Sequence, residues 1–284
     1  MKDILKELKK YKTWIPPGHF YSPIPDVDVI RKRKNEVFNP QRRCGDINMN
    51  IEGQLEFLKS CEDYYSKIPF PEKKQGDFRY YYENDMFGYA DGISLYLIMN
   101  AFKPSKIIEI GSGFSSAVML DTCDLNQELN KTQITFVEPY PDRLHSLLSD
   151  KDNISLYECI VQDTPEDLFR NLDKDDILFI DSSHVSKAGS DVNYLFFEIL
   201  PLLKSGVIIH IHDIGINFQY PYKWIEEGRA WNESYLLRAF LMNNNSYEIL
   251  LYNAQLYNRK HDYFKEKMPL YTKAPGGSFW MKKI

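Results

Sequence analysis

Five short apolar runs, with four segments of helical spacing between them, restrict the fold of this 284-residue chain more than any other feature. Strands separated by helices at this spacing form crossover units, which join parallel strands. Two further runs near the C-terminus lack the regular alternation and predict an antiparallel edge. The runs are Lys106–Ile110, Gln133–Val137, Ile154–Tyr157, Ile177–Ile180, Val207–Ile211, Tyr247–Leu251 and Ser278–Met281; the helical segments are Ser115–Leu120, Asp142–Leu148, Pro165–Leu172 and Asp191–Leu203. The pattern predicts a doubly wound α/β domain.

Prolines repeatedly interrupt the chain before this pattern begins. They predict an N-terminal extension or lid over residues 1–75 that wraps over the domain formed by residues 76–284. Helical spacing appears within the extension at Ile51–Tyr65 and just beyond it at Asp91–Phe102. The first 13 residues alternate charged with apolar side chains, so we expect an amphipathic surface helix and no signal peptide there.

The charge balance argues against some classes of partner. The chain has 35 Lys and Arg against 40 Asp and Glu, a net charge of −5, so we expect no nucleic-acid and no membrane partner. It has no apolar run of the length that a membrane-spanning helix needs. The four cysteines are scattered and show no metal-ligand spacing, which is typical of reduced thiols in a cytoplasmic protein. The oligomeric state stays open, although an extension of this composition suits exchange within a homo-oligomer.

Glycines follow the first expected strand directly. Gly111 and Gly113 allow a sharp turn and a close approach to a ligand, with a helix expected to begin just beyond. Glu138 ends the second expected strand, where a carboxylate is placed to accept the hydroxyls of a ribose. Together they predict an adenosine-containing ligand at the carboxyl ends of the strands.

The identity of that ligand depends on the charges and side chains around the turn. Ser116 stands where a dinucleotide-binding sequence requires a third glycine. Glu109, two residues before the first glycine, suits a cationic ligand better than a pyrophosphate. The sequence therefore favours S-adenosylmethionine over NAD.

Acidic and histidine side chains end the fourth and fifth expected strands. Asp181 and His184 follow the fourth, and His212 and Asp213 follow the fifth, where His210 alternates with Ile211 and shares a face with His212. Because parallel strands end at one edge of a sheet, these groups are expected to converge beside the ligand.

Two chemical uses of this group remain open. Asp181, His212 and Asp213 could hold Mg²⁺ or Mn²⁺, which would lower the pKa of a substrate hydroxyl. Alternatively, His184 or His212 could accept the hydroxyl proton as a general base, oriented by Asp181 or Asp213.

Three runs carry a resemblance to a known family: IIEIGSGFSS, FVEPYPDRL and FIDSSHVSKAGSDVNYLFFEILPLLKSGVIIHIHDI. They resemble the class I S-adenosylmethionine-dependent methyltransferases, and more narrowly the metal-dependent O-methyltransferases of sugars and natural products. The likeness spans roughly residues 85–255 and, weakly, 16–26. It implies a Rossmann-like fold with seven strands, the last of them antiparallel.

The resemblance also implies roles for particular residues. Glu109, Gly111, Ser112 and Gly113 would hold the methionine half of the cofactor, Glu138 the ribose, and Gln162 and Asp163 the adenine. Acidic residues at the positions of Asp181, His212 and Asp213 hold the metal in those enzymes, and here His212 replaces a carboxylate.

Methyl transfer requires alignment and the exclusion of water, so a lid is expected. The loop at 16–26 is the candidate lid, and its His19 is a candidate catalytic residue.

The segment after the fifth expected strand is a candidate for binding the acceptor. It contains Trp224, Arg229 and Trp231, which suit a sugar ring and its anionic group, although Trp231 also suits the core of a helix. A basic cluster at 31–34 is typical of a solvent-exposed surface, and it could also contact a nucleotide-linked acceptor.

The sequence thus predicts a methyltransferase that uses S-adenosylmethionine and acts on an oxygen of a small polar acceptor. A sugar, a nucleotide-linked sugar or a related glycan or capsule precursor is the expected acceptor. The alternatives are a nucleotide-sugar oxidoreductase on the same fold and a non-catalytic nucleotide-binding module.

Overall fold

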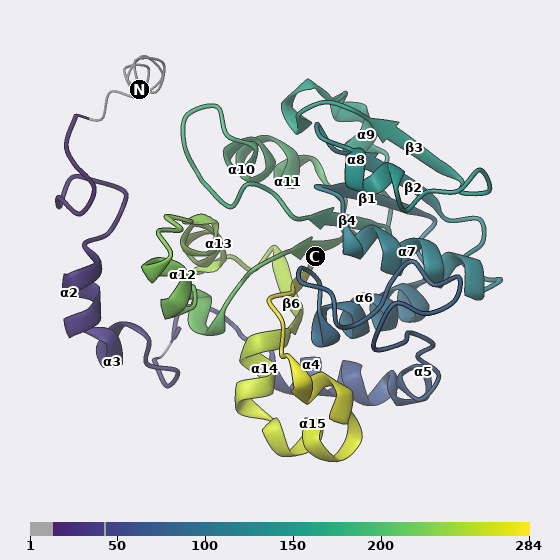
Figure 1. Ribbon diagram of the computed structural model, residues 1–284, viewed down its shortest axis with the longest axis horizontal. Helices are drawn as coiled ribbons and strands as arrows, with labels where there is room; N and C mark the ends of the chain where they lie inside the picture. Colours follow the sequence, from purple (N-terminus) through teal and green to yellow (C-terminus); the bar gives the residue numbers. More distant parts are fainter. Residues whose placement is uncertain (1–13, 43) are drawn as a thin grey trace.

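The computed structural model describes residues 14–42 and 44–284, so the helix expected in the first 13 residues lies outside the described residues. A seven-stranded sheet forms the centre of the molecule, with the strand order β3-β2-β1-β4-β5-β7-β6 (Figure 1). β1 to β5 pair in parallel, whereas β7 runs antiparallel to β5 and β6. The strands are β1 (Lys106–Ile110), β2 (Gln133–Val137), β3 (Ile154–Tyr157), β4 (Ile177–Ile180), β5 (Ile208–Ile211), β6 (Tyr247–Tyr252) and β7 (Phe279–Lys283). The predicted mostly parallel sheet with an antiparallel edge is confirmed.

The strand order reverses beside β1. From β1 the chain proceeds outward through β2 and β3 on one side, and then returns to β4 and β5 on the other. The crossovers at this point leave opposite sides of the sheet, so a crevice opens beyond the carboxyl ends of β1 and β4. This topology places the residues that follow β1, β2, β4 and β5 around one crevice.

Alternating side chains along each strand divide the hydrophobic core into two layers. In β4, Ile177 and Phe179 belong to the layer that contains α6 and α7, whereas Leu178 and Ile180 belong to the layer that contains α10 and α13. Burial on both faces explains why the central strands are apolar throughout. The helices of these layers are α6 (Tyr89–Phe102), α7 (Phe114–Leu125), α8 (Asp142–His145), α9 (Glu166–Arg170), α10 (Asp191–Tyr194), α12 (Tyr222–Glu226) and α13 (Glu233–Leu241).

The helix α6 lies almost entirely inside the protein. Twelve of its 14 residues are buried, and the one buried carboxylate, Asp91, accepts hydrogen bonds from the Gly277 and Ser278 backbone amides at 3.0 and 2.8 Å. These bonds satisfy the buried charge and attach α6 to the start of β7. No helix in the described part of the chain is both long and apolar enough to cross a membrane.

The helix expected over Asp191–Leu203 is present as one uninterrupted helical run over residues 191–202, which contains a π-helical turn. α10 continues into a π-helical turn at Leu195–Ile199 and then a single turn, α11 (Leu200–Leu202). Pro201 has no backbone N–H, so the regular hydrogen-bond ladder cannot extend through it. Helical spacing in the sequence predicted the run but not its π-helical turn.

The extension has two parts with different surroundings. α4 (Ile51–Ser60) and α5 (Glu62–Tyr65) lie beside α6, α14 (Asn253–Arg259) and α15 (His261–Lys267), whereas α2 (Val27–Lys32) and α3 (Lys34–Val37) stand at the side of the molecule (Figure 1). The Gln54 side chain accepts a hydrogen bond of 2.8 Å from the Tyr252 amide, which connects α4 to β6. The helix expected over Ile51–Tyr65 is interrupted at Cys61.

Candidate functional site

A hollow of about 640 Å³ lies at the carboxyl ends of β1, β4 and β5, and we call it the strand-end hollow. It lies where the topology opens a crevice, and segments following four different strands contribute to its wall. The lining residues are Asp85, Met86, Phe87, Gly111, Ser112, Gly113, Phe114, Ser115, Glu138, Arg143, Asp181, Ser182, Ser183, His184, His212, Asp213, Trp224, Arg229 and Trp231.

The turn after β1 has a backbone that only glycine suits. Gly111 has a φ of +80°, and a Cβ atom there would lie 2.0 Å from the backbone oxygen of Asp181. Gly113, by contrast, has an extended backbone, and the nearest atom to a Cβ built on it is Arg143 Nη1 at 3.7 Å. The first glycine is therefore required for packing against β4, whereas a Cβ on the second would make only ordinary van der Waals contact with the Arg143 side chain.

Glu138 reaches the strand-end hollow from the end of β2. Its Oε2 accepts hydrogen bonds from the Ser112 amide at 2.9 Å and the Ser112 hydroxyl at 3.3 Å, and its Oε1 accepts one from the Tyr140 amide at 2.8 Å. These donors fix the carboxylate against the glycine turn. The position suits the recognition of two vicinal hydroxyls.

The expectation for Glu109 requires correction. Its side chain is fully buried beneath the glycine turn, where the Ser115 and Ser116 hydroxyls donate to its two carboxylate oxygens. Burial raises the pKa of Glu109 to about 8 against the opposing effect of these bonds. Glu109 therefore supports the turn from below, and it is not part of the lining of the strand-end hollow.

Ser116 completes the support beneath the turn. Besides its bond to Glu109, its hydroxyl accepts a hydrogen bond of 3.0 Å from the Gly113 amide at the start of α7. The serine at the third-glycine position thus has a structural role in this turn.

Four ionisable groups meet around His184. Its Nδ1 lies 2.9 Å from Glu233 Oε2, and its Nε2 lies 3.4 Å from Asp181 Oδ1 and 3.6 Å from Asp213 Oδ2. His184 and Asp213 both have left-handed backbones, with φ of +60°. Such strain in non-glycine residues is typical of functional sites.

The charges of this cluster follow from its contacts. Burial lowers the pKa of His184, but the contacts with Asp181 and Glu233 outweigh it and raise the pKa to about 10. His184 is therefore an imidazolium at neutral pH and is already protonated, which argues against its predicted use as a general base. Burial raises the pKa of Asp181, but His212 and His184 outweigh it and lower that pKa below its ordinary value.

The pKa of Asp213 is shifted in the opposite direction from that of Asp181. Its side chain lines the strand-end hollow, and burial raises its pKa in spite of the nearby His212 and His184. A carboxylate with a raised pKa is a better proton acceptor than one with a lowered pKa. Asp213 is therefore the group in this cluster best placed to receive a proton.

The two histidines of β5 and its continuation share one face but have different surroundings. His210 is fully buried between Phe179 and Trp280, with ring centroids 3.7 and 4.5 Å away, and burial lowers its pKa well below the ordinary value. His212 reaches the strand-end hollow and lies 3.6 Å from Asp213 Oδ1 through its Nε2. Burial lowers the pKa of His212, but Asp181 and Asp213 outweigh it and raise the pKa.

The described residues do not fit the predicted metal site. Across 14–42 and 44–284, no three His, Cys, Asp or Glu side chains are grouped so as to hold a metal ion. Asp181 and Asp213, two of the predicted ligands, both face the His184 Nε2. The imidazolium thus supplies the positive charge that a metal would supply between these carboxylates.

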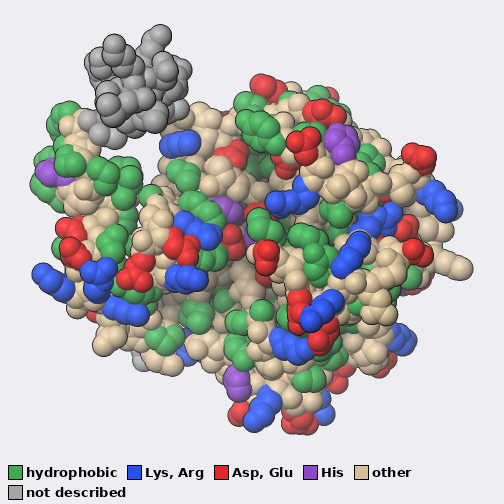
Figure 2. Space-filling view, viewed as in Figure 1, with side chains coloured by type: hydrophobic (Ala, Val, Ile, Leu, Met, Phe, Trp, Pro, Cys, Tyr) green, Lys and Arg blue, Asp and Glu red, His purple; other side chains and the backbone are tan. Residues whose placement is uncertain are grey.

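Besides Glu109, three predicted site residues lie outside the strand-end hollow. Gln162 donates to the Gly189 carbonyl at 2.9 Å, and neither it nor its neighbour Asp163 is part of the lining. His19 stacks on Phe20 in the loop at 16–26, with ring centroids 4.9 Å apart. Hydrophobic side chains gather on this segment (Figure 2), and Phe20 is 80% exposed, so the loop does not cover the hollow in this structure.

Several lining residues were not identified from the sequence. Asp85, Met86 and Phe87 precede α6 in a segment without a motif, and Arg143 lies in the FVEPYPDRL run, where only Glu138 was singled out. Glu233, which binds His184, begins α13 some 50 residues further along the chain. Its contact depends on tertiary packing, for which the local sequence carries no signal.

Comparison with known proteins agrees with this arrangement. Residues 108–214 match the protein family described as a methyltransferase domain. An uncharacterized protein of Archaeoglobus fulgidus is 32% identical over 166 residues, which are 56% of this chain and 74% of that protein. Together with the strand order and the glycine turn, these matches show that the chain belongs to the class I S-adenosylmethionine-dependent methyltransferases.

Solved structures show a more distant likeness. The plantazolicin methyltransferase BamL, in complex with a triazolic desmethylPZN analog and S-adenosylhomocysteine, is 16% identical over 82% of this chain and 97% of that chain, with a TM-score of 0.44. An O-methyltransferase from Bacillus cereus in complex with S-adenosylhomocysteine is 12% identical over 91% of this chain and 100% of that chain, with a TM-score of 0.42. Neither likeness is close enough to carry a functional argument.

Proposed function

We propose that this methyltransferase transfers the methyl group of S-adenosylmethionine to an oxygen of a small polar acceptor. A sugar, a nucleotide-linked sugar or a related glycan or capsule precursor is the acceptor class that we favour. The observation that carries the proposal is one shared hollow, in which the glycine turn and Glu138 face the carboxylates of Asp181 and Asp213.

The strand-end hollow fits the cofactor in charge and in shape. Four carboxylates line it, from Asp85, Glu138, Asp181 and Asp213, and they outnumber the guanidiniums of Arg143 and Arg229 and the imidazolium of His184. An excess of carboxylates favours a ligand that carries an ammonium and a sulfonium. Glu138 would accept the ribose hydroxyls, and the space beside Gly113 would admit the methionine half. When bound, S-adenosylmethionine supplies an electrophilic methyl group on a positively charged sulfur.

Asp213 is the residue that we assign to the acceptor proton. Its carboxylate lines the hollow and is flanked by two imidazoles, of His184 and His212, at 3.6 Å each. An acceptor hydroxyl that donates to Asp213 would lose its proton as its oxygen attacks the methyl carbon. His184, held by Glu233, would stabilise the cluster's negative charge without itself taking the proton.

Aromatic side chains near the hollow support a carbohydrate acceptor. The Arg229 guanidinium packs against both Trp224 and Trp231, 4.7 and 5.0 Å from their ring centroids, and all three residues line the strand-end hollow. Indole rings offer the apolar faces against which sugar rings stack. The net charge of −5 supports a small molecule over a nucleic acid as the partner.

The test is a comparison of binding with turnover. Calorimetry should detect S-adenosylmethionine and S-adenosylhomocysteine but not NAD(H), and a screen of nucleotide sugars and phosphorylated small molecules should identify the methylated product. With that acceptor, Asp213→Asn should lower kcat by about a hundredfold or more, while affinity for S-adenosylhomocysteine changes little. Binding of NAD(H) alone would contradict the proposal and favour an oxidoreductase. Unchanged turnover in Asp213→Asn would contradict the role of Asp213.

A further inference from the structure

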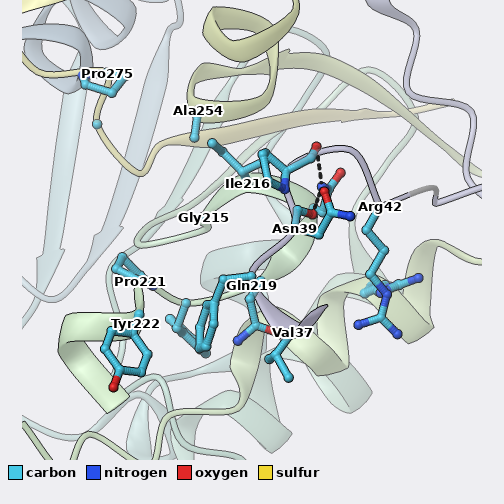
Figure 3. Close-up of a pocket in the computed structure, with 16 residues that line it drawn as sticks. Val37, Asn39, Arg42, Gly215, Ile216, Gln219, Pro221, Tyr222, Ala254 and Pro275 are labelled. Carbon is cyan, nitrogen blue, oxygen red and sulfur yellow. Dashed lines mark hydrogen bonds between the residues drawn. The ribbon is translucent and has the colours of Figure 1, made fainter. Parts of the chain in front are cut away.

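A second hollow, of about 470 Å³, lies on the far side of the loop that follows Asp213, and we call it the arginine hollow (Figure 3). One wall is the loop from Gly215 to Tyr222, and the facing wall is the segment from Val37 to Arg42 that follows α3. Arg238 of α13 and the Pro275–Gly276 turn complete the lining. The hollow therefore joins the N-terminal extension to the catalytic domain.

The charged side chains that line the arginine hollow are all basic. Its lining includes Arg42 and Arg238 but not a single Asp or Glu among the described residues, although the whole chain carries a net charge of −5. Within residues 14–42 and 44–284, neither guanidinium is found in an ion pair or in a side-chain hydrogen bond. Arginines that lack a protein partner and share one hollow are suited to an anionic ligand.

The pKa of a neighbouring thiol responds to the same positive charges. Burial raises the pKa of Cys44, and the guanidiniums that oppose this effect belong to Arg238, Arg42 and Arg259. Both arginines of the hollow are therefore close enough to Cys44 to lower the pKa of its thiol against the effect of burial. Lys34 adds a further cation at the rim, 4.1 Å from the centroid of the Tyr222 ring, and Lys and Arg side chains cluster over α2 and α3 on this side of the molecule (Figure 2).

The arginine hollow adjoins the methyl-transfer site. Val37, Phe38 and Gln219 line both it and a bridging hollow of about 290 Å³. Arg229 and Trp231 line both the bridging hollow and the strand-end hollow. The bridging hollow therefore shares wall residues both with the strand-end hollow and with the arginine hollow.

We propose that the arginine hollow binds a phosphate or diphosphate group of the acceptor, while the acceptor's sugar extends along the bridging hollow, past Arg229 and Trp231, toward Asp213. The proposal rests on the function proposed above. S-adenosylmethionine has no phosphate, so an anion site outside the strand-end hollow has no role in holding it. Two guanidiniums from separate segments suit a multiply charged phosphate or diphosphate better than a carboxylate, which one guanidinium satisfies.

The first experiment titrates inorganic pyrophosphate, orthophosphate and acetate into the full chain by calorimetry. Pyrophosphate should bind, and Arg42→Ala and Arg238→Ala should each weaken its binding by about tenfold or more, since each removes a charge-assisted contact. Arg170→Ala, an exposed arginine on α9, is the matched control and should bind pyrophosphate like the wild type. Arg42 is exposed, so its variant tests the site even if Arg238→Ala fails to fold.

Titration of S-adenosylhomocysteine separates this proposal from the proposed function. Its affinity should be unchanged in all three variants and in the presence of pyrophosphate, because the two hollows are distinct. No pyrophosphate binding, equal binding by Arg42→Ala and the wild type, stronger binding of acetate, or displacement of S-adenosylhomocysteine by pyrophosphate would each overturn the anion site. Failure of S-adenosylhomocysteine to bind the wild type would instead overturn the proposed function.

The second experiment decides whether the anion belongs to the acceptor. Nucleotide sugars and their unphosphorylated sugars are compared as methyl acceptors with the wild type and Arg42→Ala. Methylation of nucleotide sugars alone, with a KM raised in Arg42→Ala and an unchanged kcat, supports the proposal. Equal methylation of the unphosphorylated sugars would overturn it.

Discussion

His184 Nδ1 lies 2.9 Å from Glu233 Oε2, and this contact joins the segment after β4 to the start of α13. Both side chains are buried, and both belong to segments that line or adjoin the strand-end hollow. The pair holds an imidazolium beside Asp181 and Asp213. The first prediction tests that charge.

Glu233→Gln should lower the pKa of His184 from its raised value of about 10, because the neutral amide no longer stabilises the imidazolium. A raised pKa contributes stability that is fully present below the ordinary value of 6.5 and is lost as the pH rises through about 10. Urea unfolding between pH 6 and pH 10 should therefore show the variant losing this contribution at lower pH than the wild type.

The control for that measurement is Glu158→Gln. Glu158 lies 3.6 Å from Nε2 of His145, but both side chains are more than half exposed. Solvent screens such a pair, so its removal should leave the pH profile of stability unchanged. Identical profiles for Glu233→Gln and the wild type would show that His184 is not held as an imidazolium.

The second prediction concerns the two glycines of the turn. Gly111→Ala should destabilise the fold by about 2 to 4 kcal/mol, because the new Cβ overlaps the Asp181 backbone oxygen and the backbone is left-handed. Gly113→Ala, whose Cβ would make only ordinary van der Waals contact, should change the free energy of unfolding by less than about 1 kcal/mol. Thermal unfolding of both variants measures the difference, and equal losses would contradict the packing argument.

The third prediction separates two carboxylates that the sequence assigned to cofactor binding. Glu138→Gln should weaken S-adenosylhomocysteine binding by about tenfold, since Glu138 lines the strand-end hollow as a charged acceptor. Asp163→Asn should leave that affinity unchanged, because Asp163 lies outside the lining. Calorimetry measures both variants, and a large loss in Asp163→Asn would restore the adenine contact expected from the family resemblance.

The fourth prediction concerns divalent cations. Since the imidazolium of His184 lies between Asp181 and Asp213, EDTA should not change the rate of methyl transfer. A metal that polarised the acceptor would contribute several kcal/mol to the rate, so its removal would be obvious. Loss of activity in EDTA with recovery on addition of Mg²⁺ or Mn²⁺ would reinstate the metal site.

The sequence was sufficient to predict the sheet because every central strand is buried on both faces and therefore apolar throughout. Ile177–Ile180 was located without error for this reason, and the antiparallel edge followed from the missing crossover helix. Strand ends in a parallel sheet share one edge, so the placement of Glu138, Asp181, His184 and Asp213 around a common hollow could also be predicted.

The remaining features depend on tertiary contacts. Motif position placed Glu109 near the ligand, but the hydroxyls of α7 bind its carboxylate beneath the turn. Spacing alone identified His184 as a candidate base, but Glu233, from a distant helix, determines its charge. His19 lies in a loop whose position the sequence pattern does not specify.

The contact between Gly111 and the Asp181 backbone oxygen has an evolutionary consequence. Because the two segments touch with no room for even a methyl group, neither can shift without displacing the other. New acceptor preferences in related enzymes are therefore expected to arise in the peripheral segments at 85–87 and 214–232. The close contact between the ends of β1 and β4 is expected to stay unchanged.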